Sequence, residues 1–249
     1  MPNIFEPKAN SLAKLTLILG AAVPVLAITL GSAISRSPSN TGVGNPLLQP
    51  VPFSHKHHAW ELGIDCRYCH KSVETSAKAS LPTTETCMTC HSQIWTNSPL
   101  LDPVRKSYET GQPIKWAVAN KVPEFVYFDH SIHVNKGVSC NNCHGAVQKM
   151  NLVSKGRAFF MVWCLQCHNS PEKYMYKDET RPDLTPRQQV FNLYKKFQAD
   201  PDGHNMTQQE RNAMKGDEQV GVDPKLGEQL VKERNLVKAQ MKDCTVCHR

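Results

Sequence analysis

Residues 128–144 read Phe-Asp-His-Ser-Ile-His-Val-Asn-Lys-Gly-Val-Ser-Cys-Asn-Asn-Cys-His. The stretch ends in Cys-x-x-Cys-His, the spacing at which Cys140 and Cys143 take up the two vinyl groups of a haem and His144 binds its iron. Upstream, His130 and His133 are three residues apart, as on one face of a helical turn. We therefore expect one complete haem site here, and a second-side ligand for each of two different haems.

The Cys-x-x-Cys-His motif occurs five times, and the five copies use all ten cysteines of the chain. The expected thioether cysteines are Cys66 and Cys69, Cys87 and Cys90, Cys140 and Cys143, Cys164 and Cys167, and Cys244 and Cys247. The expected proximal iron ligands are His70, His91, His144, His168 and His248. Zinc would need ligands in fours and a redox dithiol would not need the histidine, so the pattern predicts five covalently bound c-type haems.

The composition is poor in conventional core material for a chain of 249 residues. Aromatic residues make up only 7%, and there are 17 Pro and 13 Gly. Porphyrin rings are large apolar plates whose burial replaces Leu and Phe packing. We therefore expect a mostly α-helical and irregular fold, rich in loops, with a core built by its cofactors. The net charge of +7 comes from scattered Lys and Arg, which is not the pattern of a nucleic-acid-binding protein.

An uncharged stretch of twenty residues covers positions 15–34, and as a helix it would span about 30 Å, the thickness of a hydrocarbon core. Residues 1–36 are therefore expected to be a single uncleaved transmembrane anchor, and the preceding lysines favour a cytoplasmic N-terminus. The alternative is a secretion signal that is cleaved near residues 31–33. Residues 37–52, rich in Pro, Gly, Asn and Ser, are expected to form an extended linker to a haem domain at 53–249.

A two-haem unit is duplicated within the expected haem domain. The pattern Phe-x-His-x-x-His at 53–58 recurs at 128–133, and each copy precedes two Cys-x-x-Cys-His motifs at a nearly constant offset. Regular repetition of this kind predicts two related units, at 53–100 and 128–170.

The repeated histidines are expected to bind the distal sides of four haem irons. These ligands are His55, His58, His130 and His133. His57 falls outside the repeated pattern and is expected at the surface. Five irons need ten axial ligands, so one position remains, opposite His248. The candidates for that position are Met161, Met150 and His204, the last of which follows a turn signal typical of an exposed loop.

Phe-x-His-x-x-His ahead of Cys-x-x-Cys-His resembles the class III multihaem cytochromes, the cytochrome c3 and c7 families. The resemblance implies that the first histidine of each pair binds the haem of the next motif and the second that of a later one. The implied pairs are His55 with His70, His58 with His91, His130 with His144, and His133 with His168. It also implies that a residue just upstream of the fourth motif binds the last iron, which ranks Met161 first, Met150 second and His204 third.

One anchor helix followed by five motifs resembles the pentahaem cytochrome subunits (ActA) of bacterial alternative complex III, a quinol-oxidising membrane assembly. The resemblance implies an electron-transfer subunit that relays electrons from quinol towards a periplasmic acceptor, with catalysis in its partners. Those partners would be an iron-sulfur subunit, quinol-binding membrane subunits, a monohaem cytochrome, and a soluble acceptor such as a cytochrome c or blue-copper protein. Because thioether attachment takes place outside the cytoplasm, the haem domain is expected on the periplasmic side of the bacterial cytoplasmic membrane.

Two other functions remain open. A multihaem reductase acting on nitrite or a similar oxyanion would need a five-coordinate haem beneath a cluster of Lys, His or Arg. A stand-alone quinol dehydrogenase of the NapC/NrfH kind would share the single anchor helix and would be active as a purified subunit.

Residues 171–249 are expected to be a helical segment that ends in the fifth haem motif. Apolar residues at helical spacing predict a helix over 187–197. A capping box is predicted at 207–210. Asp223 and Pro224 are typical of a helix start, and we expect that helix to continue to Met241.

Overall fold

A computed structural model describes residues 8–216 and 222–248. The chain divides into two compact units, Met1–Val43 and Gly44–Arg249, which we describe separately. We call them the N-terminal unit and the haem-motif unit.

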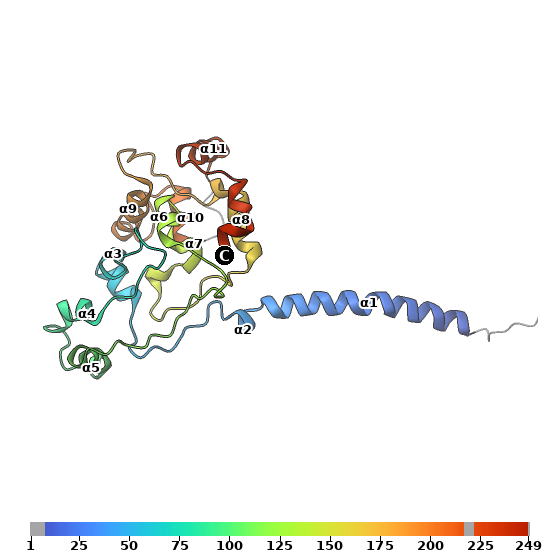
Figure 1. Cartoon of the computed structure of the whole chain (residues 1–249), viewed down its shortest axis with the longest axis horizontal. Coiled ribbons are helices and arrows are strands. Elements are labelled where there is room, and N and C mark those ends of the chain that lie inside the picture. Colours follow the sequence, from blue (N-terminus) through green and yellow to red (C-terminus); the bar gives the residue numbers. More distant parts are fainter. Residues whose placement is uncertain (1–7, 217–221, 249) are drawn as a thin grey trace, which may run out of the picture. The chain divides into compact units, whose positions relative to one another are not determined.

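The N-terminal unit is dominated by one long helix, α1 (Ala9–Arg36), which runs through Pro24 without interruption (Figure 1). Its mean hydropathy of 2.2 and its 28 residues make it a candidate membrane span. At about 1.5 Å per residue such a helix exceeds the thickness of a hydrocarbon core. None of its residues is buried within the protein, as expected for a helix whose apolar surface faces lipid. The short helix α2 (Pro38–Thr41) follows it.

The haem-motif unit consists of short helices joined by long loops, as the composition predicts. Its α-helices are α3 (Cys66–Cys69), α4 (Thr84–His91), α5 (Asp102–Thr110), α6 (His130–Asn135), α7 (Cys140–His144), α8 (Met161–Asn169), α9 (Pro186–Ala199), α10 (Gln208–Lys215), α11 (Pro224–Glu233) and α12 (Cys244–Cys247). A π-helical turn, η1 (Lys56–Glu61), and 3₁₀ turns η2 (Pro99–Leu101), η3 (Val147–Lys149), η4 (Pro171–Lys173) and η5 (Gln240–Lys242) complete the unit. The described residues form no β-strand, only isolated bridges at Pro46–Ser154 and Val138–Met175.

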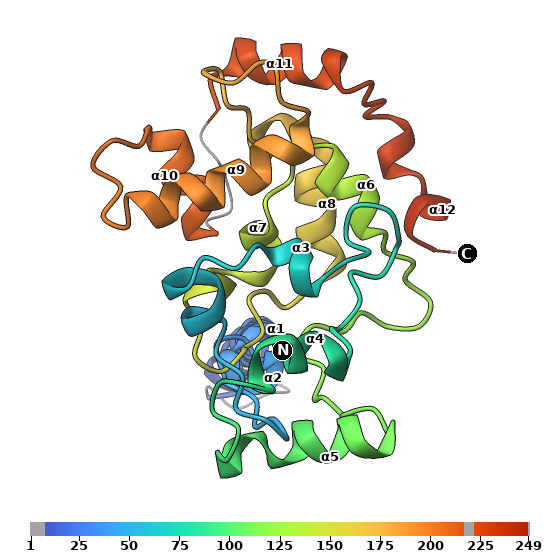
Figure 2. The same ribbon diagram turned by 90° about the vertical axis from the view of Figure 1, so that its left-hand side faces the viewer.

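Two ends of the haem-motif unit are distinct in Figures 1 and 2. Helices α4 and α5 lie at one end, and α9, α10 and α11 lie at the other. Helices α3, α6, α7 and α8, which carry most of the candidate haem ligands, lie between them. The fold therefore places helical packing on both sides of the ligand-bearing centre.

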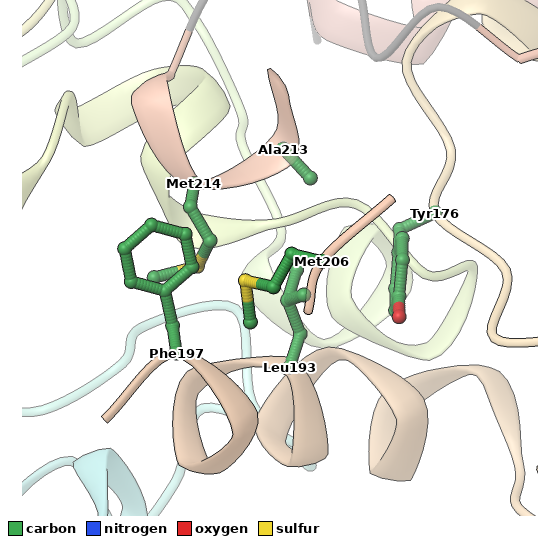
Figure 3. Close-up of a cluster of buried hydrophobic side chains, with 6 residues drawn as sticks. All are labelled: Tyr176, Leu193, Phe197, Met206, Ala213 and Met214. Carbon is green, nitrogen blue, oxygen red and sulfur yellow. The ribbon is translucent and has the colours of Figure 1, made fainter. Parts of the chain in front are cut away.

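A conventional hydrophobic core exists after all, in the helical segment after the fourth motif. Its buried members are Tyr176, Leu193, Phe197, Met206, Ala213 and Met214. In Figure 3, Leu193 and Phe197 project from one face of α9 towards the methionines of the α10 region. The side chains of Leu193 and Ala213 are fully buried. Helices α9 and α10 thus contribute ordinary side-chain packing to the loop-rich unit, in addition to any haem.

The helix predicted over 187–197 and the two helix starts predicted after it are confirmed. Thr207 caps α10 through the predicted capping box. Thr185, which was not predicted as a cap, forms the same reciprocal capping box at the start of α9. Asp223 caps α11, with Pro224 at the first helical position.

The predicted length of the helix that starts at Pro224 is wrong. Helix α11 ends at Glu233 and does not continue to Met241. The backbone at Asn235 has a φ of 50°, in the left-handed region that a helix cannot continue through. Just before it, the buried Arg234 donates hydrogen bonds to the carbonyls of Lys136 and Tyr176, at 2.5 and 2.7 Å. These tertiary contacts turn the chain towards α12.

The second half of the expected linker is attached to the haem-motif unit. The backbone N–H groups of Gly44 and Leu47 donate to the carbonyls of Lys155 and Val153, at 2.9 and 3.1 Å. Val51 is buried in a small cluster with Leu101 and Val104. Residues 44–51 are thus part of the unit's packing.

Candidate haem-binding sites

Each Cys-x-x-Cys pair lies on a short helical turn. Helices α3, α7 and α12 coincide with the first, third and fifth motifs, and the second and fourth lie within α4 and α8. Residues three apart on a helix share one face, so both cysteines of a motif point to the same side. None of the ten cysteines forms a disulfide. Local caps hold two of the turns, since Asp65 accepts the N–H of Arg67 and Ser139 accepts the N–H of Asn141.

The structure brings three of the predicted histidine pairs together. The ring centroids of His58 and His91 are 6.1 Å apart, those of His130 and His144 6.2 Å, and those of His133 and His168 6.3 Å. An imidazole nitrogen binds a metal at about 2.0 Å, so two rings on opposite sides of one ion have centroids about 6 Å apart. The three separations therefore fit one iron between each pair.

The fourth predicted pair also lies together. Burial, together with the neighbouring His70 and His58, lowers the pKa of His55 to about 4. A lowered pKa keeps the imidazole neutral at physiological pH, which is the form that binds a metal. His55 directly precedes η1, and His58 lies within it.

The two duplicated patterns have the same local geometry. Phe53 lies edge-on to His55 at 4.9 Å and stacks on His58 at 4.4 Å. Phe128 makes the same contacts with His130 and His133, at the same two distances. In each copy one phenyl ring holds two imidazoles that face different proximal histidines.

A second interaction orients the imidazoles. In seven of the nine candidate histidines, Nδ1 donates a hydrogen bond to a backbone carbonyl at 2.7–3.1 Å. The pairs are His58 to Ser54, His70 to Ser80, His91 to Ile94, His130 to Ala77, His133 to Asp129, His168 to Met241, and His248 to Phe125. Because a carbonyl only accepts, Nδ1 carries the hydrogen and Nε2 keeps its lone pair for a metal.

The remaining two of the chain's eleven histidines do not share this arrangement. His57 pairs through Nδ1 with the carboxylate of Glu61 at 2.9 Å, and its side chain is half exposed. This agrees with its expected place at the surface. His204 is 81% exposed, and its nearest ionic partner is Asp202 at 3.9 Å. The structure therefore separates two surface histidines from the nine candidate ligands, seven of which a backbone carbonyl orients.

The donor set fits haem better than zinc. Within residues 8–216 and 222–248, no three His, Cys, Asp or Glu side chains converge on a point where they could share a metal ion. Instead the thiols come in pairs and the imidazoles in facing pairs. That arrangement is what a porphyrin requires, with thioethers at its rim and one imidazole on each face of its iron.

The thiols of successive motifs are close neighbours in space, in an order that differs from the sequence. Burial raises the pKa of Cys87, and the Cys69 thiol beside it adds to the effect. Burial likewise raises the pKa of Cys66 to about 12, with a further contribution from the nearby Cys140. The first motif therefore lies between the second and the third.

The same reasoning extends the row to the fifth motif. Burial raises the pKa of Cys143 to about 12, and Cys167 is its strongest thiol neighbour. Burial also raises the pKa of Cys164, and Cys247 contributes to the rise. The spatial order of the motifs is second, first, third, fourth and fifth.

Hydrogen bonds support this order. The Tyr68 hydroxyl of the first motif lies 2.7 Å from the Thr89 hydroxyl of the second. At the other end of the row, the Tyr127 N–H donates to the carbonyl of Cys247 at 2.8 Å. The carbonyl of Met241, in η5, holds His168 of the fourth motif just before the chain enters the fifth.

The two methionines considered for the fifth iron have different surroundings. Met161 begins α8, one helical turn before Cys164, and is 67% exposed. Since Cys164 neighbours Cys247, Met161 is on the helix that borders the fifth motif. The Met150 sulfur accepts a hydrogen bond from the Ser154 hydroxyl at 3.7 Å, and the Met150 methyl group lies beside Gly145, the residue that follows the third motif.

Sequence reasoning missed the residues that hold the third motif from the C-terminal segment. The Tyr194 hydroxyl of α9 donates to the Asn141 side chain at 2.8 Å, and the Asn141 amide donates to the Met214 carbonyl at 2.6 Å. These partners are more than fifty positions apart in the chain, and the periodicity of α9 predicted only a buried face for Tyr194. No local sequence pattern predicts a hydrogen bond between residues so far apart in the chain.

Comparisons with known proteins agree with the two duplicated segments. Residues 126–185 match the model of the family "cytochrome c7 and related cytochrome c", and residues 32–107 match that of the class III cytochrome c family. The chain is also 37% identical, over 97 residues, to the menaquinone reductase multihaem cytochrome c subunit of Nitratidesulfovibrio vulgaris. That alignment covers 39% of this chain and 45% of the relative, so the chain spans less than half of the relative's length. The chain is thus similar to multihaem c-type cytochromes over the segments that carry its duplicated motifs.

Proposed function

We propose that this chain is an electron-transfer subunit with five covalently bound c-type haems, and that catalysis takes place in partner subunits. The observation that carries the proposal is the set of facing histidines, with centroids 6.1–6.3 Å apart in three pairs. An iron closed on both faces by protein side chains leaves no position for a substrate, but it still exchanges electrons.

The chain's own residues would attach the haems and occupy both faces of their irons. When bound, each haem would supply an iron that gains and loses one electron. The ten cysteines hold the rims, and the backbone carbonyls at Nδ1 keep the imidazoles in the metal-binding tautomer. The row of motifs from second to fifth would place each site beside the next, which is the arrangement that electron relay requires.

We assign distal ligands as the resemblance implies. His55 serves the first motif, His58 the second, His130 the third and His133 the fourth. For the fifth we keep Met161 first and Met150 second. The position of Met161 on the helix that borders the fifth motif supports this choice, as does the engagement of Met150 beside the third.

The domain plan and membrane placement also belong to the proposal. Residues 1–36 would anchor the chain by one membrane crossing, with the N-terminus in the cytoplasm, 37–52 would connect it, and 53–249 would hold the haems in the periplasm. The long apolar helix α1 supports the crossing. Because residues 44–47 hydrogen-bond within the haem-motif unit, the connection would consist of residues 37–43.

The membrane complex we favour is one of the alternative complex III type. Quinol would be oxidised by partner subunits, and electrons would pass through an iron-sulfur subunit and this chain to a periplasmic acceptor. Support comes from the five motifs behind a single apolar helix and from the similarity to a subunit of a quinone-linked complex.

In a second candidate function, electrons flow in the opposite direction. The relative from Nitratidesulfovibrio vulgaris is named as part of a menaquinone reductase. In a complex of that kind this chain would pass electrons towards a quinone. The proposed ligand set is the same in both cases, so the two candidates differ in partners and in the order of potentials.

The test is to purify the full-length chain from a host with c-type haem maturation and to count haems by mass and by pyridine haemochrome. We expect five haems, low-spin spectra and no binding of carbon monoxide. A high-spin haem that binds carbon monoxide and turns over nitrite would overturn the proposal in favour of a reductase. Quinol oxidation by the purified chain alone would favour a stand-alone dehydrogenase.

A further inference from the structure

Helix α9 lies at the joint between the two duplicated haem units. Its Phe191 is buried against Val73, Val134 and Cys66. The Arg67 guanidinium, from inside the first motif, lies 4.4 Å above the Phe191 ring. One face of α9 is therefore packed against the first motif and the segment that follows it.

The next turn of α9 reaches the third motif. The Tyr194 hydroxyl donates to Asn141 at 2.8 Å, lies 3.2 Å from the Ser139 hydroxyl, and contacts the Cys140 thiol. Asn141 is fully buried and Ser139 is 1% exposed. The Cys140 thiol stands here for a thioether sulfur, because attachment of a haem converts one into the other.

Tyr194 also lies near the first motif. Burial raises the pKa of Tyr194 well above its ordinary value, and the thiols of Cys140 and Cys66 add to the rise. The phenol therefore keeps its proton at physiological pH and remains a hydrogen-bond donor. Burial makes such a donor effective, because no water competes for its acceptors.

Tyr194 is thus a polar side chain near the sulfurs of two neighbouring sites. We propose that Tyr194 is a positioning residue, which fixes the third motif against the first and sets the reduction potential of the haem attached at Cys140. The inference rests on the proposed function, since it requires haems at both motifs. Hydrogen bonding around a haem's ligands and attachment points is one of the means by which a protein sets its potential.

The positioning role is separable from the packing role of the same helix. Leu193, one residue earlier, is fully buried in the core with Met206 and Met214, and its side chain is apolar. Loss of the Leu193 side chain would weaken the fold without removing a polar contact. Loss of the Tyr194 hydroxyl removes the polar contact and leaves the ring.

The experiment compares full-length holoprotein carrying Tyr194→Phe, Leu193→Ala or Tyr108→Phe with the unaltered chain. Tyr108 lies on α5 and is 52% exposed, so Tyr108→Phe is the matched control. The readout is a potentiometric titration followed by optical and electron paramagnetic resonance spectra. We expect Tyr194→Phe to shift the midpoint of one bis-histidine haem and to leave the others, with Tyr108→Phe unchanged throughout.

A Tyr194→Phe chain with five haems and unaltered midpoints would overturn the inference, as would the same single-haem shift in Leu193→Ala. If Tyr194→Phe does not accumulate with five haems, Ser139→Ala decides. It removes one neighbour of the Tyr194 hydroxyl, together with the cap on the Asn141 N–H and the bond to the Ala213 carbonyl. We then expect a smaller shift of the same haem, and no shift would refute the inference. Failure of the unaltered chain to carry five low-spin haems would instead refute the proposed function.

Discussion

The imidazole rings of His130 and His144 face each other with centroids 6.2 Å apart and planes only 8° from parallel. His130 starts α6 and His144 ends α7, so two short helices are held at the separation that one metal ion requires. Burial lowers the pKa of His144 to about 4, and the neighbouring His130 adds to the effect. A neutral imidazole has a free lone pair, so His144 is in the form that binds a metal.

Removal of His130 should open one iron. In His130→Ala we expect one of the five haems to become high-spin and to bind carbon monoxide, because the third motif's iron loses its distal ligand. Absorption spectra under carbon monoxide measure this. His57→Ala is the matched control, since His57 is exposed and pairs with Glu61. Unchanged low-spin spectra in His130→Ala would contradict the assignment.

Met161 should determine the potential of the fifth haem. A thioether stabilises ferric iron less than imidazole does, so His/Met ligation raises the reduction potential. We expect Met161→His to lower the highest midpoint in a redox titration while the haem remains low-spin. Met150→His is the comparison, because Met150 lies beside the third motif. If Met150→His moves the highest midpoint and Met161→His does not, the second-choice ligand is correct.

The cap of α6 should hold two distal ligands at once. The Asp129 side chain accepts the N–H groups of Ser131 and Ile132, at 2.8 and 3.3 Å. Asp129→Ala removes this cap and should cost about 1 kcal/mol. We expect Asp129→Asn to retain most of the stability, because asparagine caps equally well. Chemical denaturation measures the difference, and equal loss in both variants would show that the negative charge, not the cap, matters.

Acid should destabilise the helical segment through a buried ion pair. Burial alone would raise the pKa of Asp178, but Lys196 at 2.6 Å and the Thr180 hydroxyl outweigh it, so the pKa of Asp178 is lowered in the folded protein. A lowered folded-state pKa contributes stability that is complete above the unfolded value of about 4. This stability is lost as the pH falls through the lower folded value.

In Asp178→Asn we expect the free energy of unfolding near neutral pH to fall by about 2 kcal/mol. The acid dependence should become shallower. Thermal unfolding followed by circular dichroism at several pH values measures both effects. Asp183→Asn is the control, because Asp183 pairs with Arg181 at the surface, where such pairs contribute little. A similar pH dependence in the unaltered chain and Asp178→Asn would contradict the prediction.

The N-terminal unit should determine where the protein resides. We expect replacement of residues 1–43 by a cleavable secretion signal to release a soluble periplasmic protein with its full haem content. Cell fractionation and haem staining check this. Membrane retention of the shortened chain would show that partner subunits or another surface hold it. N-terminal sequencing of the full-length chain distinguishes a retained anchor from a cleaved signal.

Much of the candidate site was predictable because haem attachment is local in sequence. The Cys-x-x-Cys-His spacing fits one helical turn, and the duplicated Phe-x-His-x-x-His pattern places two imidazoles beside one phenyl ring. The structure repeats that geometry around Phe53 and Phe128 at the same distances. Helix starts at Thr207 and Asp223 were equally local, because a cap depends on side chains within one turn.

Residue spacing was thus enough to nominate the attachment cysteines, nine histidines and the long apolar helix. Only the fold decided that the first motif lies between the second and third, that α11 stops at Glu233, and that Tyr194 reaches the third motif. These features depend on contacts between residues far apart in the chain. Such contacts form only when buried surfaces and hydrogen-bond partners meet in three dimensions, and no short window of sequence records them.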